Sequence, residues 1–138
     1  MTDPWSVALL VTTAVHVGFQ ATVTLLVYPA LARVAPADWA DAHAVHSRRI
    51  TPLVAVVYGG VLVSCVGALL SRPQDLGVLV AAVGTAGALL ITATVAAPTH
   101  GRLGAGRTAH LVTRLLVADR LRLTLALVAA LGAVAARW

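Results

Sequence analysis

The chain has 138 residues, 59% of them hydrophobic and only 11% charged, and its ten basic and five acidic residues give a net charge of +5. Because soluble domains are about 25% charged, this composition excludes an ordinary soluble protein and indicates that a lipid bilayer surrounds most of the chain. Every basic residue is an arginine beside an apolar segment, which favours contact with anionic headgroups and argues against a nucleic-acid partner.

Four apolar segments are long enough to cross a bilayer, whose hydrocarbon core of about 30 Å takes about 20 helical residues. They cover about residues 5–34, 51–71, 76–97 and 118–138. Backbone groups in lipid have no water to bond, so spanning segments must be helical. The sequence therefore predicts an all-α fold. We expect residues 1–138 to form a single domain, an integral membrane four-helix bundle. A tight hairpin at Pro73 and two long amphipathic cytoplasmic connections would join its helices.

The first segment carries a polar stripe, because His16, Gln20, Thr24 and Tyr28 recur every four residues and share a helical face. Polar side chains within a span face the bundle interior or a wet cavity. We therefore expect His16 and Gln20 at the floor of a pocket, with Tyr28 as a further candidate for contact with a cofactor. His16 alone fits either a buried, hydrogen-bonded histidine or a haem ligand. The other spans have no histidine at matching depth, which argues against a bis-histidine haem.

The first connection, "WADAHAVHSRRITP" at 39–52, places His43 and His46 three residues apart and follows them with Arg48 and Arg49. Asp38 is the expected N-cap of a helix that carries both histidines on one face. Two interpretations remain open for the pair. The rings lie passively among lipid headgroups, or they act as a base or as metal ligands.

The second connection, "PTHGRLGAGRTAHLVTRLLV", returns His100 and His110 to the same side of the membrane. Its glycines predict a flexible turn, followed by a helix over 107–117. Because imidazole is the commonest transition-metal side-chain ligand, His43, His46 and His100 are candidate ligands of a metal. The sequence has no paired Glu-x-x-His motifs, which argues against a di-iron bundle.

The last segment begins with Asp119 and Arg122, three residues apart and able to pair on one helical face. The pair either neutralises itself at the helix entrance or belongs to a site, where an arginine is suited to hold an enolate, phenolate or carboxylate.

Most arginines lie in or beside the first and third connections, so we expect those connections in the cytoplasm and both termini outside. The abundance of Ala, Val, Gly and Arg indicates a G+C-rich bacterial genome, and thus a multi-pass protein of a bacterial cell membrane. Small residues form packing faces on two spans and offer a route to a homo-oligomer. They are Gly60, Ser64 and Ala68, and Gly77, Gly84, Gly87 and Ala88.

Four landmarks resemble a known family. A span ends in "YPAL", a Trp-bearing connection follows, "APTHGRL" closes the third span, and "LLVADRLRLTLALVAAL" ends the chain. This order is similar to that of the small four-helix membrane proteins that include the anthrone oxygenases. The matching positions are Pro29, Trp39, Pro98, Leu103 and Arg122. The sequence departs from the family pattern at Tyr28, His100 and Asp119, where His, Asn and His are usual.

The resemblance implies an oxygenase-like or redox enzyme that oxidises a lipophilic, phenolic small molecule in a histidine-lined pocket on the cytoplasmic side. His43 or His46 would remove a proton, and Arg122 and Arg49 would stabilise the anion that O2 attacks. The cofactor is then either none, with O2 as co-substrate, or a transition metal on His43, His46 and His100. The alternatives are a non-catalytic oligomeric membrane protein and a component that transports metal or a small solute.

Overall fold

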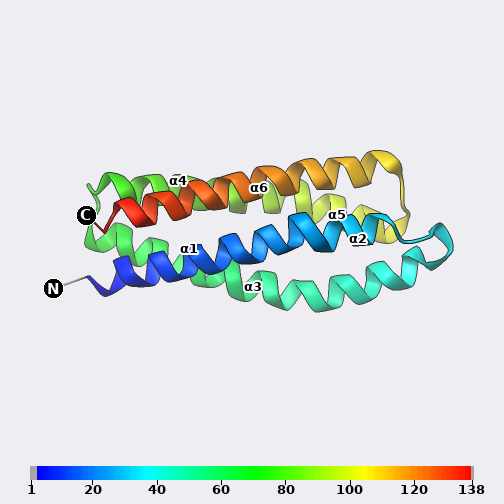
Figure 1. Cartoon of the computed structure of the whole chain (residues 1–138), viewed down its shortest axis with the longest axis horizontal. Coiled ribbons are helices and arrows are strands. Elements are labelled where there is room, and N and C mark those ends of the chain that lie inside the picture. Colours follow the sequence, from blue (N-terminus) through cyan, green and yellow to red (C-terminus); the bar gives the residue numbers. More distant parts are fainter. Residues whose placement is uncertain (1–2, 138) are drawn as a thin grey trace.

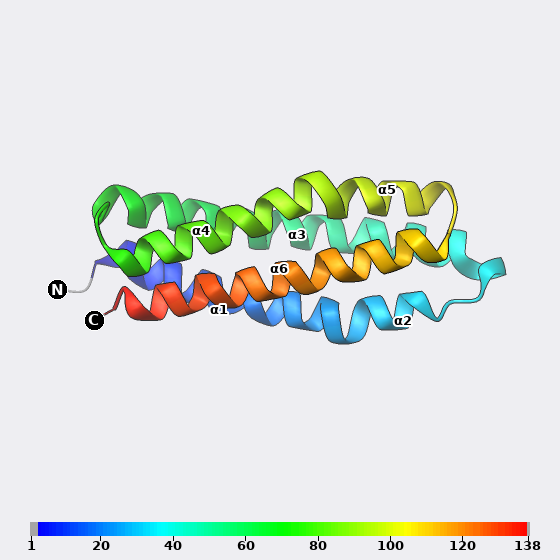
Figure 2. The same ribbon diagram turned by 90° about the horizontal axis from the view of Figure 1, so that it is seen from above.

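Four helical rods lie side by side in a long bundle, and each runs opposite to the rod before it (Figure 1, Figure 2). The computed structural model describes residues 3–137. The first rod comprises α1 (Pro4–Thr22), the π-helical segment η1 (Val23–Val27) and α2 (Tyr28–Ala32), and the second is α3 (Trp39–Ser71), after the short 3-10 helix η2 (Pro36–Asp38). The third rod comprises α4 (Leu76–Ile91), the π-helical segment η3 (Thr92–Ala96) and α5 (Ala97–Ala105), and the fourth is α6 (Ala109–Ala135).

The chain begins and ends at one end of the bundle, which we call the terminal end, and the opposite end, with residues 33–38 and 106–108, is the connection end (Figure 1). Three rods are long and apolar enough to cross a membrane: Pro4–Ala32, Pro36–Ser71 and Leu76–Ala105. The predicted all-α four-helix architecture is confirmed, and the three apolar rods indicate a multi-pass membrane protein. α6 carries Asp119, Arg120 and Arg122 in its first half, and its crossing of the bilayer stays a prediction. Trp138, the last residue of the predicted span 118–138, lies outside the described residues.

The two connections are more helical than the sequence predicted. α3 runs without a break from Trp39 through Pro52, although the sequence predicted a separate span that begins at residue 51. Pro52 removes one backbone donor and crowds the carbonyl four residues earlier, and the burial of Trp39 and His43 in the segment before it offsets this cost. Likewise α5 includes two glycines of the expected turn and ends only at Gly106.

Both π-helical segments precede a proline. Val23–Val27 ends two residues before Pro29, and Thr92–Ala96 ends two residues before Pro98. A proline ring clashes with the carbonyl four residues earlier, and a wider turn relieves that clash. The first and third rods are therefore locally widened at similar heights, in the connection half of the bundle.

The terminal half is held together by close contact between α4 and α6. A Cβ added at Gly84 would lie 2.7 Å from the backbone nitrogen of Ala129, and one added at Gly132 would lie 2.5 Å from that of Ala81. On α3, Ser64 contacts α1, with its hydroxyl 2.6 Å from that of Thr12. Gly84, Gly132 and Ser64 thus pack against other rods of the same chain, and the homo-oligomer stays a prediction.

We expect Gly84→Ala to lower the free energy of unfolding by about 1–3 kcal/mol, because the added methyl group must push α4 and α6 apart. The matched control is Gly59→Ala, since a Cβ there meets nothing within 4 Å. Alanine favours a helix over glycine by about 1 kcal/mol, so the control should be neutral or stabilised. Unfolding in detergent, followed by circular dichroism, measures both, and equal stability of the two variants would contradict the packing described.

Candidate functional site

A partly open cavity of about 550 Å³ lies in the connection half of the bundle. Its walls come from α3 on one side and from η3 and α5 on the other, with α1, η1 and α2 behind. The main residues from these walls are Phe19, Val23, Tyr28, Ala44, Ser47, Ile50, Val54, Thr92, Ala96 and Gly101. The lining is mostly apolar, and its charged or titratable groups are His43, His100, Tyr28 and Arg122. A cavity of this size and composition suits a lipophilic small molecule.

Three imidazoles form a cluster at this cavity, and two of them, His43 and His100, line it. The ring centroids of His43 and His100 are 4.5 Å apart, and His46 stacks on His100 at 5.4 Å with an interplanar angle of 10°. The Nε2 atoms of all three rings are buried and have no hydrogen-bond partner among the described residues. Convergence of histidines from distant parts of the chain is thus confirmed for these three, whereas His110 is exposed.

Aromatic neighbours hold the histidines in place. The Tyr28 ring lies 5.9 Å from that of His46 and 6.4 Å from that of His100, and the Trp39 ring lies 5.3 Å from that of His43. Since Tyr28 and Trp39 are themselves buried, the imidazoles have little freedom to turn. A neutral imidazole keeps one lone pair, so His43 and His100 can accept a proton from a molecule in the cavity.

Arg122 brings a positive charge to the same cavity. Its guanidinium donates to Asp119 Oδ1 at 2.7 Å, and both side chains are buried. Asp119 also accepts from Gln20 at 2.6 Å and from Thr24 at 2.5 Å. Arg122 Nε is buried without a hydrogen-bond partner in the described part of the chain, so a donor is left for a bound anion. The predicted Asp119–Arg122 pair is therefore present.

His16 and Gln20 lie behind the cavity, not at its floor as the sequence suggested. His16 is fully buried and packs edge-to-face on Tyr58, with the ring centroids 4.5 Å apart. The Tyr58 hydroxyl donates to Gln20 Oε1 at 3.4 Å, and Thr92, which lines the cavity, donates to the Tyr58 oxygen at 3.2 Å. Tyr58 was not among the predicted site residues, because a single tyrosine inside an apolar span gives no pattern.

Arg49 does not lie at the site where the sequence predicted it to stabilise an anion. It is exposed and lies outside the cavity lining. An arginine near the membrane interface keeps its guanidinium hydrated unless a partner replaces the water. The anion-binding role assigned to it therefore has no support from its position, and Arg122 remains for that role.

The predicted metal ligands His43, His46 and His100 lie close together, but their rings pack against one another. Within residues 3–137 no group of three or more His, Cys, Asp or Glu side chains has the arrangement of a metal site. Imidazole lone pairs lie in the ring plane, so the stacked rings of His46 and His100 do not direct them at one point between the rings. The geometry suits proton transfer better than coordination.

Comparison of the chain with protein families, with curated proteins and with solved structures finds no match.

Proposed function

We propose that the chain is a membrane-embedded enzyme that removes a proton from a lipophilic, weakly acidic small molecule and allows O2 to oxidise the resulting anion. The observation that supports the proposal is the apolar cavity in which His43, His100 and Arg122 meet. The two imidazoles supply proton acceptors, and the guanidinium supplies a buried positive charge with an unused donor.

The roles follow from the chemistry of these groups. His100 or His43 accepts the proton of a phenol, enol or activated C–H group, because a neutral imidazole has a free lone pair. Arg122 stabilises the anion so formed. For an anthrone, O2 then takes up the electrons and one oxygen atom becomes the new carbonyl, giving a quinone and water. His46 positions His100 by stacking on it.

We also propose that all four rods cross a bacterial cell membrane with the connection end in the cytoplasm. The connection half carries eight arginines and three aspartates, a net charge of +5, and the remaining two arginines and two aspartates cancel. The whole net charge of the protein therefore lies in one half of the bundle. The arginines of that half are Arg33, Arg48, Arg49, Arg102, Arg107, Arg114, Arg120 and Arg122. Such asymmetry sets orientation in membranes.

The test uses protein purified in detergent, anthrone as the probe, and O2 uptake together with quinone absorbance as readouts. We expect at least one of the variants His43→Ala and His100→Ala to lower turnover by about 10²-fold or more, namely the variant that removes the base. His110→Ala is the matched control, because it removes an exposed histidine from the same end.

Two results would overturn the proposal: no anthrone oxidation by the wild type, or turnover in both cavity variants equal to that of His110→Ala. Metal analysis of the same samples addresses the other route that the sequence suggested. Stoichiometric metal in the wild type that is lost in a His43→Ala/His46→Ala variant would replace the cofactor-free mechanism with a metal-dependent one.

A further inference from the structure

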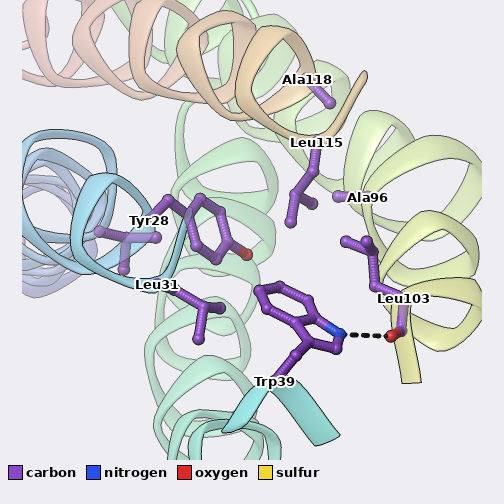
Figure 3. Close-up of a cluster of buried hydrophobic side chains, with 8 residues drawn as sticks. Tyr28, Leu31, Trp39, Ala96, Leu103, Leu115 and Ala118 are labelled. Atoms are coloured by element: carbon purple, nitrogen blue, oxygen red, sulfur yellow. Dashed lines mark hydrogen bonds between the residues drawn. The ribbon is translucent and has the colours of Figure 1, made fainter. Parts of the chain in front are cut away.

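The cavity is closed toward the connection end by a cluster of buried side chains. Trp39, from the start of α3, packs among Tyr28, Leu31 and Leu115, and its indole nitrogen donates to the Leu103 carbonyl at 2.9 Å (Figure 3). Trp39 is 6% exposed and Leu103 is fully buried. The hydrogen bond of the indole therefore joins the second rod to the third rod, on the connection-end side of the histidines.

Arg107 strengthens this closure from the last connection. Its guanidinium lies over the Trp39 ring, 5.3 Å from the centroid, and donates to the Ala32 carbonyl at 2.6 Å. One side chain thus joins the connection after α5 to the end of α2 and to the indole.

The cavity is open at its side, along the seam between α3 and α5. The lining residues from α1, η1 and α2 are buried or half-buried, but six lining residues on the two seam helices are exposed. They are Ala40, Ala44 and Thr51 on α3, and Ala97, Gly101 and Gly104 on α5. All are small, and they flank the contact between the His43 and His100 rings that joins the two helices.

The seam reaches membrane depth. Thr51 and Ala97 lie at the ends of the predicted spans 51–71 and 76–97, and the cavity continues past them to Val54 and Thr92. α3 has 33 residues, about 50 Å of helix against a hydrocarbon core of about 30 Å. The seam therefore runs from the headgroup region into the acyl chains.

We propose that the cavity opens sideways into the bilayer between α3 and α5, and that its ligand arrives from the membrane phase through this seam. The ligand class is then a membrane-dissolved molecule with an apolar body and one weakly acidic oxygen or carbon, which Arg122 and the histidines meet at the inner end. The identity of the ligand rests on the proposed function, but the direction of the opening does not.

The test measures what surrounds the seam without using a ligand. A nitroxide is attached to Ala97→Cys, or to Thr51→Cys on the opposite wall, in a Cys65→Ala background and in phosphatidylcholine–phosphatidylglycerol vesicles. Collision rates with O2, which concentrates in lipid, and with a water-soluble nickel chelate are compared. Val56→Cys, an exposed position within the second predicted span, is the lipid reference, and His110→Cys is the reference at the connection end.

We expect the ratio of O2 to nickel collisions at both seam positions to match that at Val56 and to exceed that at His110. A ratio nearer to the His110 value at either seam position would overturn the sideways opening and indicate a water-filled cavity. This outcome is distinct from failure of the proposed function. A lipid-like seam in a protein that does not oxidise anthrone refutes only the chemistry, and a wet seam in an active protein refutes only the route.

Discussion

Replacing Asp119 with alanine is expected to lower the free energy of unfolding by about 3–5 kcal/mol, because it leaves the Arg122 guanidinium buried without its counter-charge. Asp119 is 1% exposed and Arg122 is 5% exposed, so solvent screens neither charge. The carboxylate also accepts from Gln20 and Thr24 on the first rod. The substitution therefore breaks polar contacts within α6 and between the first and last rods.

Two variants separate this loss of pairing from a general effect of altering α6. Arg120→Ala removes a neighbouring charge that is exposed, and such surface changes fall within about 0.5 kcal/mol. The double variant Asp119→Leu/Arg122→Met removes both charges at similar volume, and it should be more stable than Asp119→Ala because no unpaired charge remains. Unfolding by SDS titration in mixed micelles compares all four proteins. A stability of Asp119→Ala within the range of Arg120→Ala would show that the charge pair is not buried as described.

The same pair illustrates what the sequence can predict. The spacing of Asp119 and Arg122 places both on one helical face, and the spacing of Gln20 and Thr24 does the same on the first span. Local periodicity gives these faces because it depends only on helix geometry. The contacts between the faces, such as Gln20 to Asp119, depend on how far each rod slides along its neighbour. That register is set by packing between rods, which a single sequence does not encode in any local pattern.

For the histidines, too, the sequence predicted the shared location but not the contacts of each ring. Their shared end of the bundle followed from topology, which is why His43, His46 and His100 were predicted to meet. Their separate roles did not follow. Only the three-dimensional arrangement shows that His43 and His100 line the cavity while His46 stacks behind His100, and that His110 and Arg49 face outward. Tyr58 was missed because one hydroxyl in an apolar span gives no periodic signal, although its partners Gln20 and Thr92 lie on two other rods.

Replacing Trp39 with alanine is expected to lower the free energy of unfolding by about 3–5 kcal/mol, the usual effect of truncating a buried aromatic side chain. The Leu103 carbonyl lies in the last turn of α5, where carbonyls have no partner within the helix, and the indole nitrogen satisfies it. The Arg107 guanidinium also loses the ring over which it lies. The variant therefore leaves a cavity and unsatisfied polar groups at the connection end.

Trp39→Phe distinguishes the two contributions. It keeps most of the ring but removes the donor to Leu103, so the expected loss is about 1 kcal/mol. Trp5→Ala is the control at the terminal end, where the indole is 41% exposed and the loss should be smaller than for Trp39→Ala. Thermal unfolding in detergent gives these differences. Because Trp39 closes the end of the cavity, Trp39→Ala should also raise nickel collisions at a nitroxide on Ala97, whereas Trp39→Phe should leave them unchanged. If Trp39→Ala leaves both the stability and the collision ratio of the wild type intact, the indole does not close the cavity.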